Sequence, residues 1–292
     1  MKGTSERAYA KLNLSLDVLG AMPDGYHEMR MVMQTVSLYD EVRVTLTDGG
    51  ARSVRSNYGF LPRDGRNIAL RAADAFCAAA GRPELGVEIS LRKRIPVGAG
   101  LAGGSTNAAA VLRAMDRLLD TRFSRAELEA LGASLGSDVP FCVAGGTQLA
   151  AGRGDRLTDL AAFPRCGVVI CMPRFSIKTP ELFARIDGRR SRVHPDTDGL
   201  VAAAADRDLR GAARRMYNVF EDVLPPQRGR EIAAIKQRLL DAGALGAIMT
   251  GTGSAVFGVF PSPAAAKPAA AALREACRSV FTAVPTEKLM EY

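Results

Sequence analysis

The sequence contains no tryptophan, only two histidines and five cysteines, and it has no long uninterrupted apolar run. The cysteines are odd in number and scattered, none stands in a CxxC pair, and two histidines do not complete a zinc site. These absences exclude a disulfide framework and a structural zinc site. We expect buried thiols in a reducing compartment at Cys77, Cys142, Cys166, Cys171 and Cys277.

The lack of any apolar run of about 18 residues excludes a membrane-spanning helix. The opening residues, Met1 to Arg7, lack the apolar stretch of a signal peptide. A cytoplasmic protein without a membrane partner is therefore expected. With 47% hydrophobic and 24% charged residues, the 292-residue chain can bury the core of one large domain or of two packed ones.

Basic residues exceed acidic ones by 39 to 31, which gives a net charge of +8. This balance suits nucleic acid, an anionic membrane surface or a phosphate-rich small substrate, and charge alone does not choose among them. Nucleic-acid binding by stacking needs exposed aromatic side chains, and few aromatic residues lie between the basic ones. Nucleic-acid binding is therefore disfavoured. The role of the densest basic cluster, residues 185–192, stays open.

The segment from Ala8 to Val18 alternates strictly between apolar and polar residues, which is the pattern of a half-buried strand. Alanine, leucine and valine occupy one face, and polar or amphipathic residues occupy the other. We therefore expect Lys11 and Asn13 to project from one exposed face, away from the core.

The remaining pattern predicts an α+β protein of two domains, residues 1–160 and 161–292. The order of elements in the second domain is typical of a ferredoxin-like split βαβ arrangement. Predicted strands cover 31–38, 41–47, 87–91, 168–172 and 256–260, and predicted helices cover 67–80, 106–119, 124–135, parts of 200–223, and 230–242, with strand, helix and strand over 247–284.

A glycine-rich turn links the predicted strand 87–91 to the predicted helix 106–119. Glycines let backbone N–H groups approach an anion, and a helix start adds free donors and a partial positive charge. This composition favours a phosphate site over a plain strand-to-helix turn. The predicted nucleotide loop consists of Pro96, Val97, Gly98, Ala99, Gly100, Leu101, Ala102, Gly103, Gly104, Ser105, Thr106 and Asn107.

Two other phosphate motifs compete for this turn. A Walker A loop needs a lysine before its serine or threonine, and no lysine precedes Ser105, so a P-loop NTPase is excluded here. Residues 98–103 do satisfy GxGxxG, but a dinucleotide site needs a strand after the helix, ending in an acidic residue. A second helix, opening with the capping box Ser124 to Glu127, follows instead and disfavours a dinucleotide.

Two further features have both a structural and a functional interpretation. Asp138 lies between Gly136, where the second helix stops, and Pro140. It is either a turn former or a general base on a rigid corner, and spacing does not decide between these. The third glycine cluster, Met249 to Ala255, is either a hairpin-like turn or a second wall of a polar cleft between the domains.

Taken together, these pieces resemble the GHMP kinases over nearly the whole chain. Residues 96–107 resemble the ATP loop of that superfamily, 136–141 its base-bearing segment and 251–254 its third motif. Residues 10–14 and 24–28 resemble the opening signature of the branch that phosphorylates 4-diphosphocytidyl-2-C-methyl-D-erythritol, and the Asp-Gly-Tyr-His-Glu element separates this branch from its cousins. The departures from the common pattern are small: Ala99 and Ala102 replace glycine, and Thr106 replaces serine.

The resemblance implies an N-terminal ribosomal-S5-domain-2-like domain, a C-terminal ferredoxin-like domain and an active site in the cleft between them. It implies ATP-dependent phosphorylation of the 2-hydroxyl of that cytidyl substrate, with Mg²⁺, in the non-mevalonate isoprenoid pathway. The alternatives are another GHMP kinase, for homoserine or a mevalonate-type alcohol, and, outside enzymes, a basic RNA-binding protein. A monomer or homodimer is expected.

The resemblance also implies roles for individual residues. Asp138 would be the base on the substrate hydroxyl, and Lys11 the cation that keeps it ionised. Ser105 or Thr106 would offer a hydroxyl to phosphate or to Mg²⁺, with Ser105 as the metal candidate. Two further residues, Lys93 and Asn67, resemble those that line the nucleotide site.

The same resemblance makes Tyr26 and His27 the cytosine-recognising pair, with Phe183 as the opposite stacking wall. Stacking is favourable for any base, and hydrogen bonds then choose among bases. Plainer alternatives are a solvated lysine at Lys11 and a core position for Phe183. The expected substrate contacts are Asn13, Tyr26, His27, Thr179, Phe183, Gly251 and Gly253.

Overall fold

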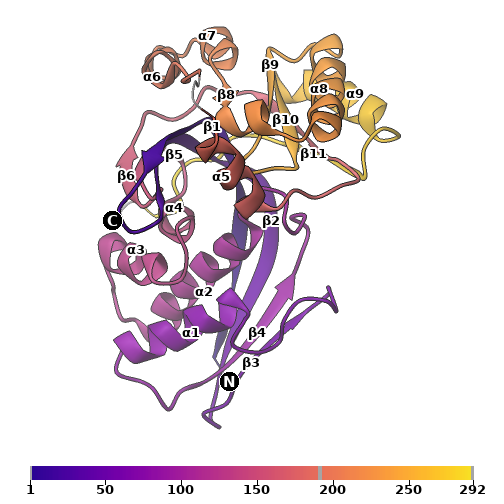
Figure 1. Cartoon of the computed structure of the whole chain (residues 1–292). Coiled ribbons are helices and arrows are strands. Elements are labelled where there is room, and N and C mark those ends of the chain that lie inside the picture. The colour runs from indigo at the N-terminus through magenta and orange to yellow at the C-terminus, as the bar shows by residue number, and fades with distance from the viewer. Residues whose placement is uncertain (1, 190–192, 291–292) are drawn as a thin grey trace.

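Two β-sheets with helices packed against them form the computed structural model, which describes residues 2–189 and 193–290 (Figure 1). The first sheet has the order β3-β4-β2-β1-β8, and β5 and β6 extend it beside the first half of β2. Neighbouring strands are antiparallel except in the pairs β3–β4 and β1–β8. The strands are β1 (Gly3–Ala21), β2 (His27–Thr47), β3 (Arg52–Ser56), β4 (Gly86–Arg92), β5 (Thr147–Gly152), β6 (Arg156–Asp159) and β8 (Tyr217–Asn218).

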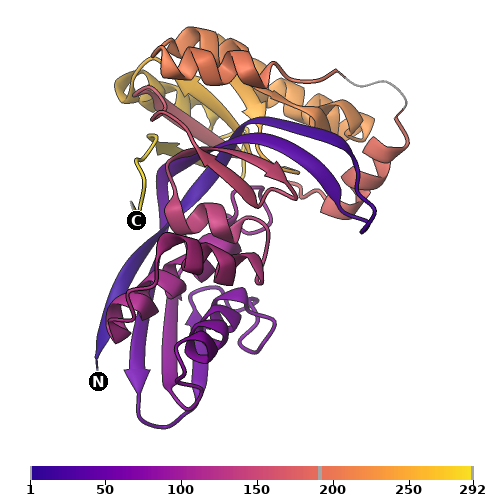
Figure 2. The ribbon, with the colours of Figure 1, turned by 90° about the vertical axis from the view of Figure 1, so that its left-hand side faces the viewer.

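Helices α1 to α4 lie on one face of the first sheet, in front of its strands in Figure 2. Helix α2 packs against β1, and α1 packs on α2. The side chains of Ala108, Ala109 and Ala110 in α2 are fully buried, and their small size lets the helix lie close to the strand. The helices are α1 (Ile68–Ala79), α2 (Gly103–Leu119), α3 (Arg125–Ala133) and α4 (Val139–Ala144).

The second sheet has the order β11-β7-β10-β9, and all its pairs are antiparallel. The last strand lies beside the first, and α8 and α9 provide the two crossovers, so the predicted split βαβ arrangement is confirmed. Its elements are β7 (Gly167–Met172), α8 (Pro226–Asp241), β9 (Gly246–Met249), β10 (Val256–Phe260), α9 (Pro263–Leu273) and β11 (Ser279–Ala283). Between β7 and α8 the chain also forms α5 (Thr179–Asp187), α6 (Thr197–Ala205), α7 (Leu209–Arg214), β8 and the 3-10 helix η1 (Val219–Val223).

The hydrophobic core has two parts, one on each face of β1. Ala8, Leu16 and Val18 belong to the part that includes helices α1 and α2. Ala10, Leu12 and Leu14 belong to the part between the two sheets, where they join apolar residues of β7, β9 and β10. Strand β1 is therefore covered on both faces and forms the structural boundary between the two halves of the molecule.

The prediction that β1 has an exposed polar face is wrong. Lys11, Asn13, Ser15 and Asp17 are all buried, with Asn13 at 0% exposure. The pairing of β1 with β2 shifts register between Tyr9 and Lys11 and again between Asn13 and Ser15. Such bulges re-aim side chains, so the strict alternation of the sequence does not map onto two constant faces. Lys11 and Asn13 point into the molecule for this reason.

Most other predicted elements are confirmed, with shifted ends. The predicted strands 31–38 and 41–47 are one strand, β2, and α2 starts at Gly103, before the expected 106. The capping box at Ser124 is present. Helices α4 and α5 were not predicted, since each has proline in its first turn and proline is read as a breaker even though that position tolerates it. Strands β3, β5, β6 and β8 were also missed.

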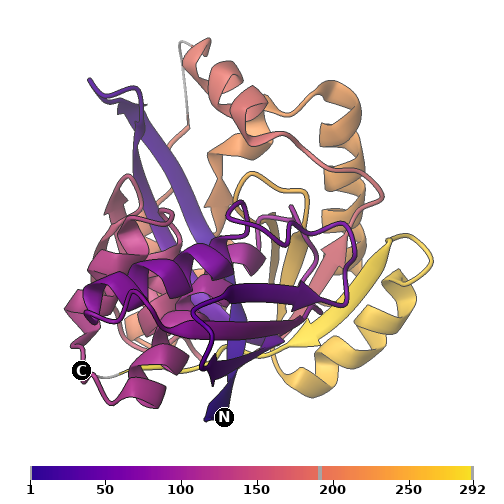
Figure 3. The ribbon, with the colours of Figure 1, turned by 90° about the horizontal axis from the view of Figure 1, so that it is seen from below.

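The chain after β11 returns to the first sheet (Figure 3). Pro285 forms a bridge with Val36, the Thr286 N–H donates to the Thr35 carbonyl (2.9 Å), and the Leu289 N–H donates to the Ala144 carbonyl (2.7 Å).

The division into residues 1–160 and 161–292 stays a prediction, and residues 190–192 of the basic cluster lie outside the described residues. All five cysteines are buried and free, as expected. In the described part of the chain, no helix has the length and apolar character needed to cross a bilayer.

A buried carboxylate, Asp40 of β2, connects the first sheet to the glycine-rich turn. It pairs with the ammonium of Lys93, which also donates to the Gly103 carbonyl (3.0 Å). Its oxygens accept the backbone N–H groups of Arg94 (2.6 Å) and Ile95 (2.8 Å) and the side-chain N–H of Asn107 (2.9 Å). Burial lowers the pKa of Lys93, and the charge of Asp40 opposes this change.

Asp40→Asn is expected to lower the free energy of unfolding by about 3–5 kcal/mol, because it leaves the Lys93 ammonium buried without a counter-charge. Urea unfolding followed by circular dichroism measures the loss. The control is Glu41→Gln, one residue further on, whose carboxylate pairs with Arg94 at a half-exposed position. This change is expected to cost less than about 1 kcal/mol. Equal losses in the two variants would contradict the role given to Asp40.

Candidate active site

The glycine-rich turn runs from the end of β4 to the start of α2, and its backbone needs the glycines. Gly98 (φ 67°) and Gly100 (φ 78°) have left-handed conformations. A Cβ atom on Gly100 would lie 2.1 Å from the Thr250 carbonyl oxygen, so no larger residue fits. Ala102 also has a positive φ (56°), directly before the first residue of α2. The turn therefore presents the free N–H groups of a helix start, a geometry suited to phosphate.

The two hydroxyls at this helix start differ in their surroundings. Thr106 is buried, and its hydroxyl donates to the Gly103 carbonyl (3.2 Å). Ser105 is partly exposed at the same helix start. Of the two, Ser105 is the hydroxyl that a ligand can reach.

A small cavity of about 190 Å³ adjoins the turn. The predicted nucleotide residues Lys93 and Asn67 both line it, but their polar groups are already bonded. The Lys93 ammonium is held by Asp40, and Asn67 caps α1 by accepting the Ala69 N–H (3.1 Å) while donating to the Pro62 carbonyl (2.8 Å). Both residues therefore shape the cavity. Its lining is Leu61, Pro62, Arg66, Asn67, Ile68, Leu91, Lys93, Val97, Gly98, Gly103, Gly104 and Asn107.

A larger cavity of about 550 Å³ lies on the other side of Gly100, and the Lys11 and Asp138 side chains meet in it. The Lys11 ammonium lies 3.5 Å from the Asp138 carboxylate and donates to the Asn13 side-chain oxygen (2.8 Å). The Lys11 side chain is 5% exposed, whereas that of Asp138 is 36% exposed. Asp138 precedes α4 without making a capping hydrogen bond. Its carboxylate is thus available to a ligand and held next to a buried cation.

Aromatic residues line the other end of the same cavity. The His27 and Phe183 rings are 4.6 Å apart, and Phe183 meets Phe220 edge-on at 5.0 Å. Tyr26 is 54% exposed, and the Arg153 guanidinium lies over its ring at 4.2 Å. The predicted residues Tyr26, His27 and Phe183 are therefore brought together, and the Phe183 ring is tilted by 35° against that of His27.

The third glycine cluster contacts the glycine-rich turn, so it forms a wall of this cavity rather than an isolated hairpin turn. The Thr250 hydroxyl accepts the Asn13 N–H (3.0 Å) and donates to the Gly100 carbonyl (3.3 Å). Gly251 lines the cavity next to Thr252, whose hydroxyl is 2.8 Å from that of Thr179. A Cβ atom on Gly253 (φ 85°) would lie 2.6 Å from the Met249 sulfur, so Gly253 shapes the loop.

Several residues at this site were missed by the sequence analysis. Asp187 at the end of α5 bonds His27 Nε2 (2.8 Å), and the buried Asn218 donates to the carbonyls of Met249 and Gly251 (both 2.8 Å). Asp40 and Arg153 belong to the same group. No local pattern marks them, because each acts on a partner far away in sequence. The one available signal was the third glycine cluster itself. A loop so rich in glycine needs hydrogen bonds from another segment to fix its conformation, and Asn218 provides them.

Two family models match the chain: the GHMP kinases N terminal domain over residues 67–146 and the GHMP kinases C terminal over residues 200–279. The chain is 41% identical over 255 residues to 4-diphosphocytidyl-2-C-methyl-D-erythritol kinase of Clostridium tetani, a match that covers 87% of this chain and 90% of the relative.

Solved structures give the same result. A crystal structure of 4-(cytidine 5'-diphospho)-2C-methyl-D-erythritol kinase has a TM-score of 0.81 and 33% identity, over 97% of this chain and 99% of its own. Homoserine kinase from Cytophaga hutchinsonii shares the fold, with a TM-score of 0.77 and 22% identity over 99% and 96% of the two chains. The predicted two-domain α+β kinase fold is confirmed, and the chain belongs to the 4-diphosphocytidyl-2-C-methyl-D-erythritol kinases of the GHMP kinase family.

Proposed function

We propose that this protein transfers the γ-phosphoryl group of ATP to the 2-hydroxyl of 4-diphosphocytidyl-2-C-methyl-D-erythritol. The observation that carries the proposal is the 550 Å³ cavity, which holds the Lys11–Asp138 pair and an aromatic cluster in a chain of this family. A kinase needs a positioned base near the acceptor hydroxyl and compensation of phosphate charge. The carboxylate of Asp138 and the ammonium of Lys11 line the same cavity as Gly100, where the glycine-rich turn meets it.

Asp138 acts as the base in this proposal. Its partly exposed carboxylate accepts the proton of the substrate hydroxyl as the oxygen attacks the γ-phosphorus, and the bond to the β-phosphate oxygen breaks. Lys11, 3.5 Å away and buried, places a positive charge beside Asp138 and balances the charge of the attacking oxygen. The side-chain oxygen of Asn13 accepts a hydrogen bond from the Lys11 ammonium and so keeps it next to Asp138.

ATP binds with its phosphates at the glycine-rich turn and its nucleoside in the cavity beside Asn67 and Lys93. Among the described residues, no group of three or more His, Cys, Asp or Glu side chains could hold a metal by itself. This fits Mg²⁺ carried by a nucleotide, since phosphates and water supply most of its ligands and one or two protein oxygens suffice. Ser105 is the residue proposed to hold it. When bound, Mg²⁺ neutralises charge on the phosphates.

The cytidyl group binds at the aromatic end of the cavity, where Tyr26 and Phe183 offer rings for stacking. The contact of His27 Nε2 with Asp187 fixes which nitrogen carries a proton. With Nε2–H donating to the carboxylate, Nδ1 is left as an acceptor, which suits the exocyclic amine of cytosine and not the carbonyl of uracil. Thr179, Gly251 and Gly253 line or shape the wall between the base and the reacting hydroxyl. The family membership favours this enzyme over the RNA-binding alternative.

The first test is turnover with ATP and Mg²⁺ on four acceptors: 4-diphosphocytidyl-2-C-methyl-D-erythritol, homoserine, mevalonate and galactose. We expect phosphorylation of the cytidyl compound alone, because only this acceptor has a base for the aromatic cluster. Coupled detection of ADP measures the rate of phosphorylation of each acceptor, and mass spectrometry identifies the product. Turnover of another acceptor, with none of the cytidyl compound, would replace the branch assignment with another GHMP activity.

Asp138→Asn is expected to lower kcat by at least about 100-fold, since the amide cannot accept the hydroxyl proton. ATP affinity, measured by calorimetry, should stay within about threefold, because Asp138 does not line the nucleotide cavity. The control is Asp120→Asn, an exposed carboxylate at the far end of α2 that pairs with Arg122. Near-normal turnover of Asp138→Asn would remove this residue as the base.

Tyr26→Ala is expected to raise KM for the cytidyl substrate about 10- to 100-fold, the value of one lost base stack, with KM for ATP unchanged. Tyr26→Phe keeps the ring and should stay close to the unmodified enzyme. Steady-state kinetics with each substrate varied in turn distinguishes the two effects. An equal rise in both KM values would show that Tyr26 acts on the fold rather than on the base.

A further inference from the structure

The short helix α4 begins next to Asp138, and its opposite end is held by one side chain of α2. Arg113 donates from one nitrogen to the carbonyls of Cys142 (2.7 Å) and Val143 (3.1 Å), which lie in the last turn of α4. Carbonyls at a helix end have no partner within the helix, and a cation there is also favourable to the helix dipole. The six residues of α4 span only about 9 Å. A shift at this end is therefore transmitted to Asp138.

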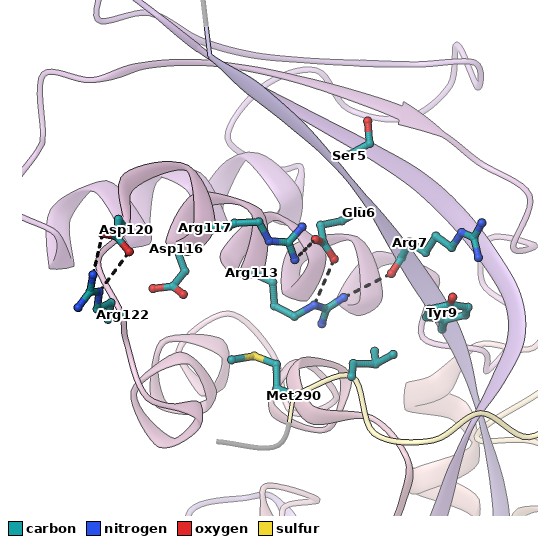
Figure 4. Close-up of a pocket in the computed structure, with 11 residues that line it drawn as sticks. Ser5, Glu6, Arg7, Tyr9, Arg113, Asp116, Arg117, Asp120, Arg122 and Met290 are labelled. Carbon is teal, nitrogen blue, oxygen red and sulfur yellow. Dashed lines mark hydrogen bonds and ion pairs between the residues drawn. The ribbon is translucent and has the colours of Figure 1, made fainter.

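The same guanidinium is bonded to β1, the strand that carries Lys11. Its Nε lies 3.5 Å from the Glu6 carboxylate, and its remaining nitrogen donates to the Arg7 carbonyl (3.4 Å). Figure 4 shows Arg113 pointing from α2 toward Glu6 and Arg7. The Arg113 side chain is only 6% exposed, and burial lowers its pKa while the Glu6 charge opposes that change.

Arg113 thus joins three elements, each of which carries one part of the catalytic site. Helix α2 starts at the nucleotide loop, β1 carries Lys11, and α4 follows Asp138. We propose that Arg113 is a positioning residue that sets the Lys11–Asp138 separation relative to the phosphate loop. This inference rests on the proposed function. Arg113 acts from behind the site, since it lines neither the nucleotide cavity nor the substrate cavity.

Lysine cannot replace arginine in this arrangement. Its single ammonium lacks the planar fork that reaches two carbonyls of α4 and two groups of β1 at once. A misplacement of about 1 Å between reacting groups costs up to about 100-fold in rate. We therefore expect Arg113→Lys to lower kcat by 10- to 100-fold while KM for ATP changes less than threefold.

The cavity in Figure 4, about 600 Å³ in volume, opens beside Arg113 and is lined by polar groups from β1 and α2. Removing the side chain in Arg113→Ala leaves a space that this cavity connects with solvent. A free guanidinium compound can therefore reach the vacated position, which makes chemical rescue possible. Rescue distinguishes a positioning role from general loss of packing, because ethylguanidinium restores the hydrogen bonds without a covalent link to α2.

The matched control is Arg117→Gln. Arg117 lies four residues further along the same helix and pairs with the same Glu6, but it is 61% exposed. Its loss removes an ion pair of β1 without touching α4. We expect kcat and both KM values to stay within twofold of the unmodified enzyme.

The experiment measures kcat and KM for all three variants, normalised to folded protein by circular dichroism, with and without ethylguanidinium below denaturing concentration. We expect a saturable rise in kcat for Arg113→Ala with ethylguanidinium, no rise with urea, and no effect on Arg117→Gln. Unchanged kcat in folded Arg113→Lys, or a loss in Arg113→Ala that ethylguanidinium does not reverse, would overturn the inference.

If Arg113→Ala does not fold, Arg113→Lys alone tests the role of Arg113, by its effect on kcat compared with its effect on KM for ATP. A drop in kcat with constant KM for ATP supports a positioning role for Arg113. A drop in kcat with a comparable rise in KM for ATP contradicts that role. The unmodified enzyme in the same assay tests the proposed function separately. Absence of turnover there rejects the proposed function, whereas normal turnover with an active Arg113→Lys rejects only the role of Arg113.

Discussion

The carboxylate of Asp40 is the constraint on which the geometry of the nucleotide end depends. Besides the Lys93 ammonium, its donors are the backbone N–H groups of Arg94 and Ile95, just before the predicted loop 96–107, and the side chain of Asn107, the last residue of that loop, in the first turns of α2. The turn between β4 and α2 has left-handed positions at Gly98, Gly100 and Ala102, and an unattached segment with such glycines has many accessible conformations. Fixing both ends to one buried group removes most of them. In the proposed function, the turn can then present backbone donors to phosphate without rearranging.

Around this anchored turn, the parts of the site come from segments far apart in the sequence. Thr250 bonds both Asn13 and the carbonyl of Gly100, so the third glycine cluster, β1 and the turn share one hydroxyl. The 190 Å³ cavity belongs to the first sheet and its helices, whereas the 550 Å³ cavity also needs α5 and the 251–252 loop of the second half. Homoserine kinase shares this fold at 22% identity, which shows that the architecture accommodates different acceptors. In the proposed function, the aromatic end of the larger cavity distinguishes the cytidyl acceptor from others.

Local patterns predicted the architecture well and the interior of the site poorly. The glycine-rich turn, the capping box of α3 and the βαββαβ order are local or periodic features, and they were found. Lys11 was expected on an exposed face, and it is buried, since alternation cannot report the two bulges that re-aim β1. Asp187, Asn218 and Arg113 were not recognised, because their partners lie 29 to 160 residues away. Family resemblance, rather than pattern, pointed to Asp138, Tyr26 and His27.

The two bulges of β1 that lie between Ala8 and Val18 have a consequence for how this sequence can change in evolution. Substitutions along the strand alter one contact at a time, but a deletion or insertion of one residue between Ala8 and Val18 would turn every following side chain to the opposite face. Lys11 and Asn13 would exchange places with leucines that pack between the two sheets. A change of length in this stretch consequently disturbs more contacts than a substitution at most of its positions. Homologues are expected to tolerate varied apolar residues there while keeping the spacing from Lys11 to Asp17 fixed.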